Sequence, residues 1–127
     1  MEEGIEKIYL KKEEVGLLIN KLKKYSFDEF LKTDHYELSL LSKGTDENEL
    51  KVIYSKFELI KLIMLRKRKS GYGNYDYYYE LSKGNYCLFA IHFPEKGVPE
   101  LVNAFISNTI FKNFLKFVIK KYGRKMI

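Results

Sequence analysis

The 127-residue sequence contains no tryptophan and only one cysteine, Cys87. One cysteine excludes an internal disulfide and any zinc site that needs several cysteines, so Cys87, which lies in an apolar segment, is expected to be a buried thiol. No apolar run reaches the roughly 18 residues that a membrane-spanning helix needs. The acidic start Met1-Glu2-Glu3-Gly4 also lacks the pattern of a secretory signal. We therefore expect a cytoplasmic protein that does not insert into a membrane.

Residues that carry catalytic chemistry are scarce. There are two histidines, His35 and His92, and no two metal-ligand residues recur at a binding spacing. The sequence has no phosphate-binding loop, no Gly-x-Ser-x-Gly elbow and no dinucleotide fingerprint. We therefore expect no catalytic residue, no metal site and no cofactor, although a nuclease that uses lysine, arginine and tyrosine in place of histidine stays open as an alternative.

The residues that are present favour a folded protein. Hydrophobic residues make up 46% of the chain and charged residues 31%, a balance that supports one packed core. We therefore expect a single domain over residues 1–127. Lysine and tyrosine are abundant, whereas glutamine is absent and alanine occurs only at Ala90 and Ala104. This usage is typical of an AT-rich genome and of thermophiles, which suggests a thermophilic archaeal or viral origin.

Positive charge is concentrated in two segments. The net charge is +6, from 23 basic and 17 acidic residues, and the last acid is Glu100. Six basic residues follow it, so residues 1–100 hold 17 of each sign (23 minus 6) and are neutral in sum: Lys112, Lys116, Lys120, Lys121, Arg124 and Lys125. A second, compact basic run spans residues 66–69. Such segments keep a protein soluble or bind a polyanion.

Hydrophobic spacing predicts several elements in the first third of the chain. Residues 5–10 favour a strand, and residues 12–25 have apolar positions at helical spacing. Ser26 and Glu29 fit a capping box, which predicts a second, short helix over 27–32. Residues 35–41 alternate between apolar and polar side chains, which predicts a strand.

The segment 49–68 fits two patterns. Alternation of apolar residues and a high content of β-branched and aromatic residues favour a strand, which is the interpretation we prefer. An apolar stripe from Leu50 to Met64 fits a helix equally well. If the helix is correct, the architecture is winged-helix-like, with 46–69 as the recognition helix and 73–93 as the wing.

The last third of the chain predicts a hairpin followed by a helix. Residues 75–81 and 86–93 are rich in β-forming residues and flank the turn Ser82-Lys83-Gly84-Asn85. Pro99 then suits the first turn of a helix that we expect to extend over 99–122. The fold class predicted from these elements is α+β, with an antiparallel sheet of four to five strands, N-terminal helices and a long C-terminal helix.

The basic run and the tyrosines that follow it predict nucleic-acid binding. Cations neutralise phosphates, and flat rings stack on unpaired bases, so this combination favours single-stranded DNA or RNA. We therefore expect a nucleic-acid-binding surface that also includes two residues of the C-terminal segment: Arg66, Lys67, Arg68, Lys69, Tyr72, Tyr75, Tyr77, Lys116 and Lys120.

A fragment of this region resembles the RNA-recognition motif. Gly71-Tyr72-Gly73 followed by alternating aromatics is similar to its longer signature, and Ile8-Tyr9-Leu10 is similar to the start of its shorter one. Asn74 interrupts the spacing and roughly sixty residues separate the two pieces, where the family has far fewer. No residue role is therefore taken from this resemblance.

The apolar positions of the C-terminal segment are too many for one narrow stripe. We therefore expect a homodimer with an interface that includes Phe111, Phe114, Phe117 and Val118. The same surface supports the alternative function, a small viral or host-defence regulatory protein that acts by binding a protein partner.

Overall fold

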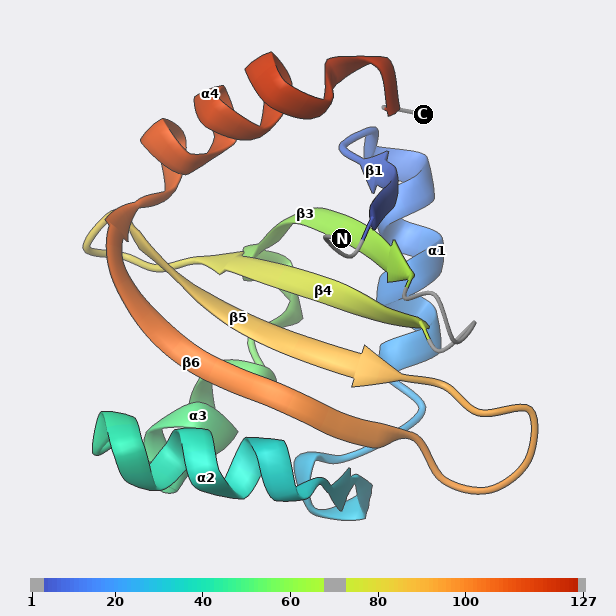
Figure 1. Cartoon of the computed structure of the whole chain (residues 1–127), viewed down its shortest axis with the longest axis vertical. Helices are drawn as coiled ribbons and strands as arrows, with labels where there is room; N and C mark the ends of the chain where they lie inside the picture. The colour runs from blue at the N-terminus through green and yellow to red at the C-terminus, as the bar shows by residue number, and fades with distance from the viewer. Residues whose placement is uncertain (1–3, 68–72, 126–127) are drawn as a thin grey trace.

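The computed structural model describes residues 4–67 and 73–125 and has an α+β fold in which four helices surround a mixed sheet (Figure 1). The strands are β1 (Gly4–Tyr9), β2 (Leu31–Lys32), β3 (Ile60–Lys67), β4 (Gly73–Glu80), β5 (Asn85–His92) and β6 (Glu100–Ile110). The helices are α1 (Lys12–Leu22), α2 (Asp34–Lys43), α3 (Glu47–Tyr54) and α4 (Phe111–Tyr122), with single 3-10 turns η1 (Phe27–Glu29), η2 (Phe57–Leu59) and η3 (Gly123–Lys125).

The six strands lie in the order β1-β3-β4-β5-β6-β2. Neighbouring strands are antiparallel except β2, which runs parallel to the start of β6 with Leu31 opposite Glu100. The sheet therefore has six strands and mixed direction, and the expectation of four or five antiparallel strands is corrected in both respects. The expected α+β class, the first strand, the first helix and the hairpin of β4 and β5 are confirmed.

The two faces of the sheet carry different layers. Residues of α1, α2 and α3 pack with one face in a cluster that includes Tyr77, Tyr79 and Phe89; we call this the helical face. On the other side, α4 packs with a cluster that includes Tyr78 and Leu88; we call this the α4 face. Figure 1 shows α4 on the opposite side of the sheet from α2 and α3. Because side chains alternate along a strand, consecutive residues of β4 enter different clusters.

Aromatic side chains fill the helical face. Phe89 makes edge-to-face contacts with Tyr54 at 5.7 Å and with Phe27 at 6.4 Å between ring centroids. The hydroxyl of Tyr54 donates to the carbonyl oxygen of Tyr25 at 2.7 Å, and that of Tyr79 donates to the carbonyl oxygen of Tyr54 at 2.8 Å. Buried tyrosine is stable here because each ring is packed and each hydroxyl has a partner.

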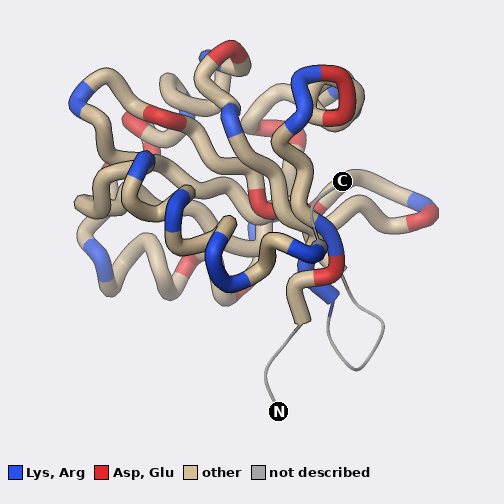
Figure 2. Tube along the Cα trace, turned by 90° about the horizontal axis from the view of Figure 1, so that it is seen from above, with Lys and Arg blue, Asp and Glu red and all other residues tan. Residues whose placement is uncertain are grey.

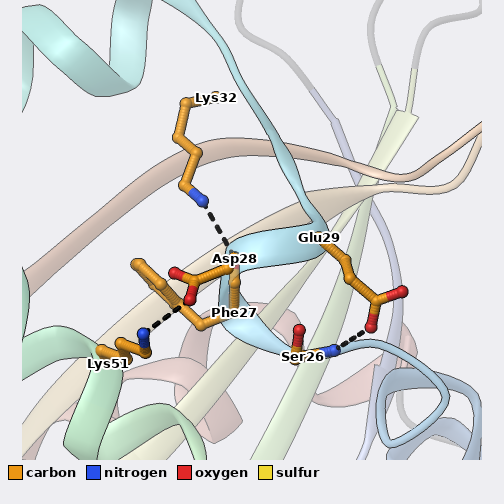
Figure 3. A network of polar contacts seen from close by, with 6 residues as sticks. All are labelled: Ser26, Phe27, Asp28, Glu29, Lys32 and Lys51. Atoms are coloured by element: carbon orange, nitrogen blue, oxygen red, sulfur yellow. Dashed lines mark hydrogen bonds and ion pairs between the residues drawn. The ribbon is translucent and has the colours of Figure 1, made fainter.

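The segment after α1 is fixed by a small polar network (Figure 3). The amide of Ser26 donates to Glu29 Oε1 at 2.7 Å, as expected for a capping box, and Lys51 Nζ lies 2.6 Å from Asp28 Oδ2. Only one 3-10 turn follows, so the predicted helix over 27–32 is wrong beyond residue 29. The reason is tertiary, because residues 31 and 32 pair with β6 as strand β2.

The predicted strand at 35–41 is a helix, α2. Thr33 caps it, since its Oγ1 accepts a hydrogen bond from the amide of Tyr36 at 3.2 Å, and Gly44 ends it in the left-handed region at φ 61°. Because the segment is short, the spacing of its leucines also fits the alternating pattern of a strand. Leu38 and Leu41 are exposed, whereas Tyr36 is buried against the sheet.

The ambiguous segment 49–68 contains both structures. Its first part is α3, and its second part is β3, which lies between β1 and β4. Neither a single strand nor a single helix is therefore correct. The winged-helix alternative is also wrong, because residues 60–67 form a strand of the main sheet and leave no recognition helix at 46–69.

The predicted helix over 99–122 begins at residue 111. Residues 100–110 form β6, which pairs with β5 along its length, and α4 follows without a connecting loop. Pro99 thus precedes a strand and not a helix. The amide of Phe111, the first residue of α4, donates to the carbonyl oxygen of Gly84 at 2.7 Å, which anchors the start of the helix to the β4–β5 turn.

Candidate functional site

The apolar side of α4 is turned towards the sheet. Phe111 and Val118 are buried, and the ring of Phe114 lies between Tyr78 and Tyr86, with centroid distances of 4.9 and 4.8 Å. Three of the four residues expected at a dimer interface are therefore buried or half-buried within the chain, and only Phe117 is exposed. The width of the apolar stripe reflects contact with the protein's own sheet, so it no longer argues for a homodimer, which stays a prediction.

The outward side of α4 is cationic. Its basic residues are exposed and form, together with the following turn, the surface that we call the α4 cationic face: Lys112, Lys116, Lys120, Lys121 and Arg124. Figure 2, which looks down onto α4, shows basic positions and no acidic position along this helix. Four residues advance a helix by about 6 Å, so Lys112, Lys116 and Lys120 form a regular row.

An aromatic ring lies within this cationic surface. The side chain of Phe117 is 52% exposed, and Lys121 Nζ lies 5.6 Å from its ring centroid. None of the ion pairs between described residues involves a lysine of α4. The charges on this surface are therefore available to an external anion.

The two described residues of the basic run, Arg66 and Lys67, do not lie on one surface. Arg66 lies on the α4 face, where its Nε is 3.2 Å from Asp76 Oδ2, whereas Lys67 extends from the opposite side of β3 and lies 3.6 Å from Glu6. Three further residues of the predicted surface, Arg68, Lys69 and Tyr72, lie outside the described residues.

Two of the predicted stacking tyrosines, Tyr75 and Tyr77, belong to the helical face. Tyr77 is fully buried, and its hydroxyl donates to the carbonyl oxygen of Leu18 at 3.0 Å, so its ring cannot stack on a base in this fold. Tyr75 is half-buried, with Phe93 6.1 Å away and Lys21 Nζ 5.5 Å from its ring centroid. Tyr75 and Lys116 lie on different sides of the sheet and do not form one surface.

A buried polar network lies on the α4 face. Asp76 is only 3% exposed, and its Oδ1 accepts from Asn74 Nδ2 at 2.6 Å while its Oδ2 accepts from Arg66 Nε. Burial raises the pKa of Tyr78 well above its usual value; the Asp76 charge adds to this, and the charge of Arg66 and its hydrogen bond to the hydroxyl oppose it. Arg66 thus connects a buried carboxylate with a buried phenol.

The network borders a hollow of about 290 Å³ on the α4 face. Its lining combines these polar groups with apolar walls: His35, Arg66, Asn74, Asp76, Tyr78, Leu88, Ala90, Val102, Asn103 and Phe105. Sequence analysis did not assign a site to Asn74, Asp76, Ala90 or Asn103. The sequence feature that could have indicated this network is Asp76. It is a charged residue in the middle of a strand that is rich in tyrosine and expected to be half-buried.

A larger hollow of about 820 Å³ lies near the β4–β5 turn and contacts α3 and β6. Three glutamates and three lysines line it, so the formal charges of its lining balance. Cys87 is buried, and burial raises the pKa of its thiol, as expected for a structural cysteine.

Within residues 4–67 and 73–125 no three metal-ligating side chains come together. The described helices also include none that is long and apolar enough to span a membrane. No family model, curated protein or solved structure matches this chain, so its function has to be inferred from its own residues.

Proposed function

We propose that this protein binds single-stranded nucleic acid through the α4 cationic face. The observation that supports the proposal most strongly is that the apolar and the cationic residues of α4 lie on different sides of the helix. Its apolar side packs on the sheet, which turns a row of exposed lysines outward, and no acid follows Glu100 in the sequence. Phosphate oxygens are the anions that such a row of separated cations suits.

The preference for single strands rests on Phe117. An exposed aromatic ring between lysines can stack on an unpaired base while the lysines contact phosphates on either side. In a duplex the base faces are covered by their neighbours, so the ring contributes less. Phosphate contacts are the same beside every base, so we expect affinity with little sequence preference.

Arg66 and Lys67, the described residues of the basic run, have a smaller part in this proposal than the sequence suggested. The charge of Arg66 is compensated by a buried carboxylate 3.2 Å away, which reduces its attraction for phosphate. Lys67 is half-exposed and lies on the other side of the strand. Among the described residues, the lysines of α4 therefore provide the main electrostatic contact.

The experiment is a titration of labelled single-stranded and duplex oligonucleotides at several salt concentrations. We expect Lys116→Ala combined with Lys120→Ala to weaken binding to all sequences alike. The slope of log affinity against log salt should decrease by about 0.7 per lost contact on single strands, hence by about 1.4 for the pair. Phe117→Ala should weaken single strands more than duplexes and leave the slope nearly unchanged.

The matched control is Lys24→Ala combined with Lys56→Ala. Both side chains are exposed, and both follow helices of the layer on the helical face, so the variant loses the same net charge far from α4. It should bind like the wild type. Absence of binding to every oligonucleotide at low salt, or equal losses in the two double variants, would refute the proposal.

A further inference from the structure

The outer edge of β6 is only partly covered by a strand. β2 pairs with it at two positions, residues 31 and 32 opposite 100 and 101, and no other strand of the described residues lies beyond β6. Helix α2, which packs with the helical face, lies along β6 (Figure 1). A long side chain of α2 can therefore pass this edge and reach the α4 face.

Lys43, in the last turn of α2, takes this course. Its Nζ lies 3.8 Å from the ring centroid of Phe105, and Phe105 packs with the cluster of the α4 face. The ring of Phe105 is half-buried, so part of it reaches the surface. None of the ion pairs between described residues includes Lys43. The pair thus resembles Lys121 and Phe117 on α4, where a lysine also lies beside an accessible ring.

The surface between this pair and α4 is free of uncompensated acids from the residues that form it. β6 leads directly into α4, and no acid follows Glu100 in the sequence. The hollow that Phe105 lines has one acid, Asp76, and its carboxylate is paired with Arg66. The exposed positions at the end of β6 are neutral: Asn108, Thr109 and Ile110. A phosphate chain that follows β6 away from α4 therefore meets little repulsion before Lys43.

The acids that follow Lys43 in the sequence have other partners. Asp46 caps α3, and its Oδ1 accepts from the amide of Asn48 at 3.0 Å. Glu47 Oε2 accepts from the hydroxyl of Tyr36 at 2.7 Å, and Tyr36 belongs to the helical face. These carboxylates lower the positive potential near Lys43, but neither is in contact with its ammonium group.

The Lys43–Phe105 pair lies within reach of a strand on α4. Phe105 precedes Phe111, the first residue of α4, by six residues, or about 20 Å of extended chain. The row from Lys112 to Lys120 adds at most about 12 Å. At about 3.4 Å for each stacked nucleotide, about ten nucleotides span both contacts, whereas about four cover only the row.

We infer that a single strand held on the α4 cationic face continues along β6 to the Lys43–Phe105 pair, which contacts one further phosphate and one base. This inference rests on the proposed function and extends its site beyond α4. A cation–π contact at an exposed site is weak, so the ammonium group of Lys43 can move from the ring to a phosphate. The uncovered ring of Phe105 then stacks on the neighbouring base. Long strands therefore bind more tightly than short ones and with a steeper salt dependence.

The test compares oligothymidylates of about 4 and about 16 nucleotides, which bracket the site sizes of single-strand-binding domains. Lys43→Ala should lower the slope of log affinity against log salt by about 0.7 on the long strand, which corresponds to one phosphate contact, and leave the short strand unchanged. Lys43→Arg keeps the charge and should preserve the slope. The matched control is Lys23→Ala, which removes an exposed lysine 5.7 Å from the ring centroid of Phe57 in the helical layer and should bind both strands like the wild type.

A second variant tests the ring. Phe105→Leu keeps an apolar side chain but removes the aromatic surface, and it should weaken the long strand at least about five-fold with little change of slope. Binding of the short strand, which needs only α4, shows that the variant is folded. If Phe105→Leu does not fold, the surface variants of Lys43 decide the question.

Equal behaviour of Lys43→Ala and Lys23→Ala on the long strand would overturn the inference while the proposed function stands. A loss in Lys43→Ala that is the same for both lengths would overturn it too, because the contact would then not be a distant one. A wild type that binds neither strand at low salt would refute the proposed function itself.

Discussion

The two faces of the sheet carry similar residues but are covered by different numbers of helices. On the helical face, Tyr77, Tyr79 and Phe89 are completely buried under three helices. The α4 face is crossed by one helix and keeps a polar network beside a hollow. Tyrosine is a core residue on both faces, but on the second Tyr78 is also linked to Arg66 and borders the hollow. A tyrosine-rich strand can thus supply a continuous aromatic core on one side of a sheet and border a polar hollow on the other.

The largest expected effect is alkaline unfolding, to which the helical face contributes more than the α4 face, where burial also raises the pKa of Tyr78. Burial raises the pKa of four tyrosines on the helical face above the ordinary value of 10.0: Tyr36, Tyr54, Tyr77 and Tyr79. Below pH 10 these tyrosines are protonated in both the folded and the unfolded chain, so their contribution to stability is fully present. Above that pH the unfolded chain releases protons that the folded protein retains, so stability falls by about 1.4 kcal/mol per pH unit for each fully buried tyrosine.

We therefore expect cooperative unfolding above pH 10, with the rise in tyrosinate absorbance coinciding with the loss of circular dichroism. Tyr77→Phe, where it still folds, should move the alkaline midpoint upward. Tyr122→Phe, at the half-exposed end of α4, is the control and should leave the midpoint in place. Tyrosinate absorbance that rises for all tyrosines while the fold persists would contradict the burial of these side chains.

A pair of core substitutions should give the next largest difference. Phe89→Ala removes a fully buried ring that contacts Phe27, Tyr54 and Tyr79, and should cost about 3–5 kcal/mol of unfolding free energy. Phe114→Ala removes a half-buried ring on the α4 face and should cost about 1–2 kcal/mol. Urea denaturation measures both, and equal losses would mean that α4 closes its face as completely as the three helices close theirs.

The smallest effect concerns the polar network of the helical layer (Figure 3). Lys51 and Asp28 lie 2.6 Å apart, but their side chains are 52% and 68% exposed, so water and salt screen the pair. Lys51→Ala should change the unfolding free energy by less than about 1 kcal/mol. Lys24→Ala, an exposed lysine of the same layer, is the control in the same denaturation experiment. A much larger loss for Lys51 would show that this ion pair, and not only the aromatic core, sets the stability of the helical layer.

Some features of this protein followed from the sequence alone. The hairpin was predictable because two β-rich runs flank a turn with glycine, and α1 because its apolar residues recur at one helical period. The concentration of positive charge after Glu100 was also visible, because it depends on the order of residues in the sequence and not on folding. For the candidate site, this was sufficient to predict the exposed Lys116 and Lys120 but not the hollow on the α4 face.

Only the tertiary structure decided the rest. Residues 100–110 are apolar on both sides and fit a helix as well as a strand, and pairing with β5 makes them a strand. Alternation assigned Tyr75, Tyr77 and Tyr79 to one face but could not show that three helices cover it. Ala90, Asp76 and Asn103 are far apart in sequence, and register alone brings them together as the floor of a hollow. Local periodicity sets which side chains share a face, whereas strand pairing and helix packing decide what that face contacts.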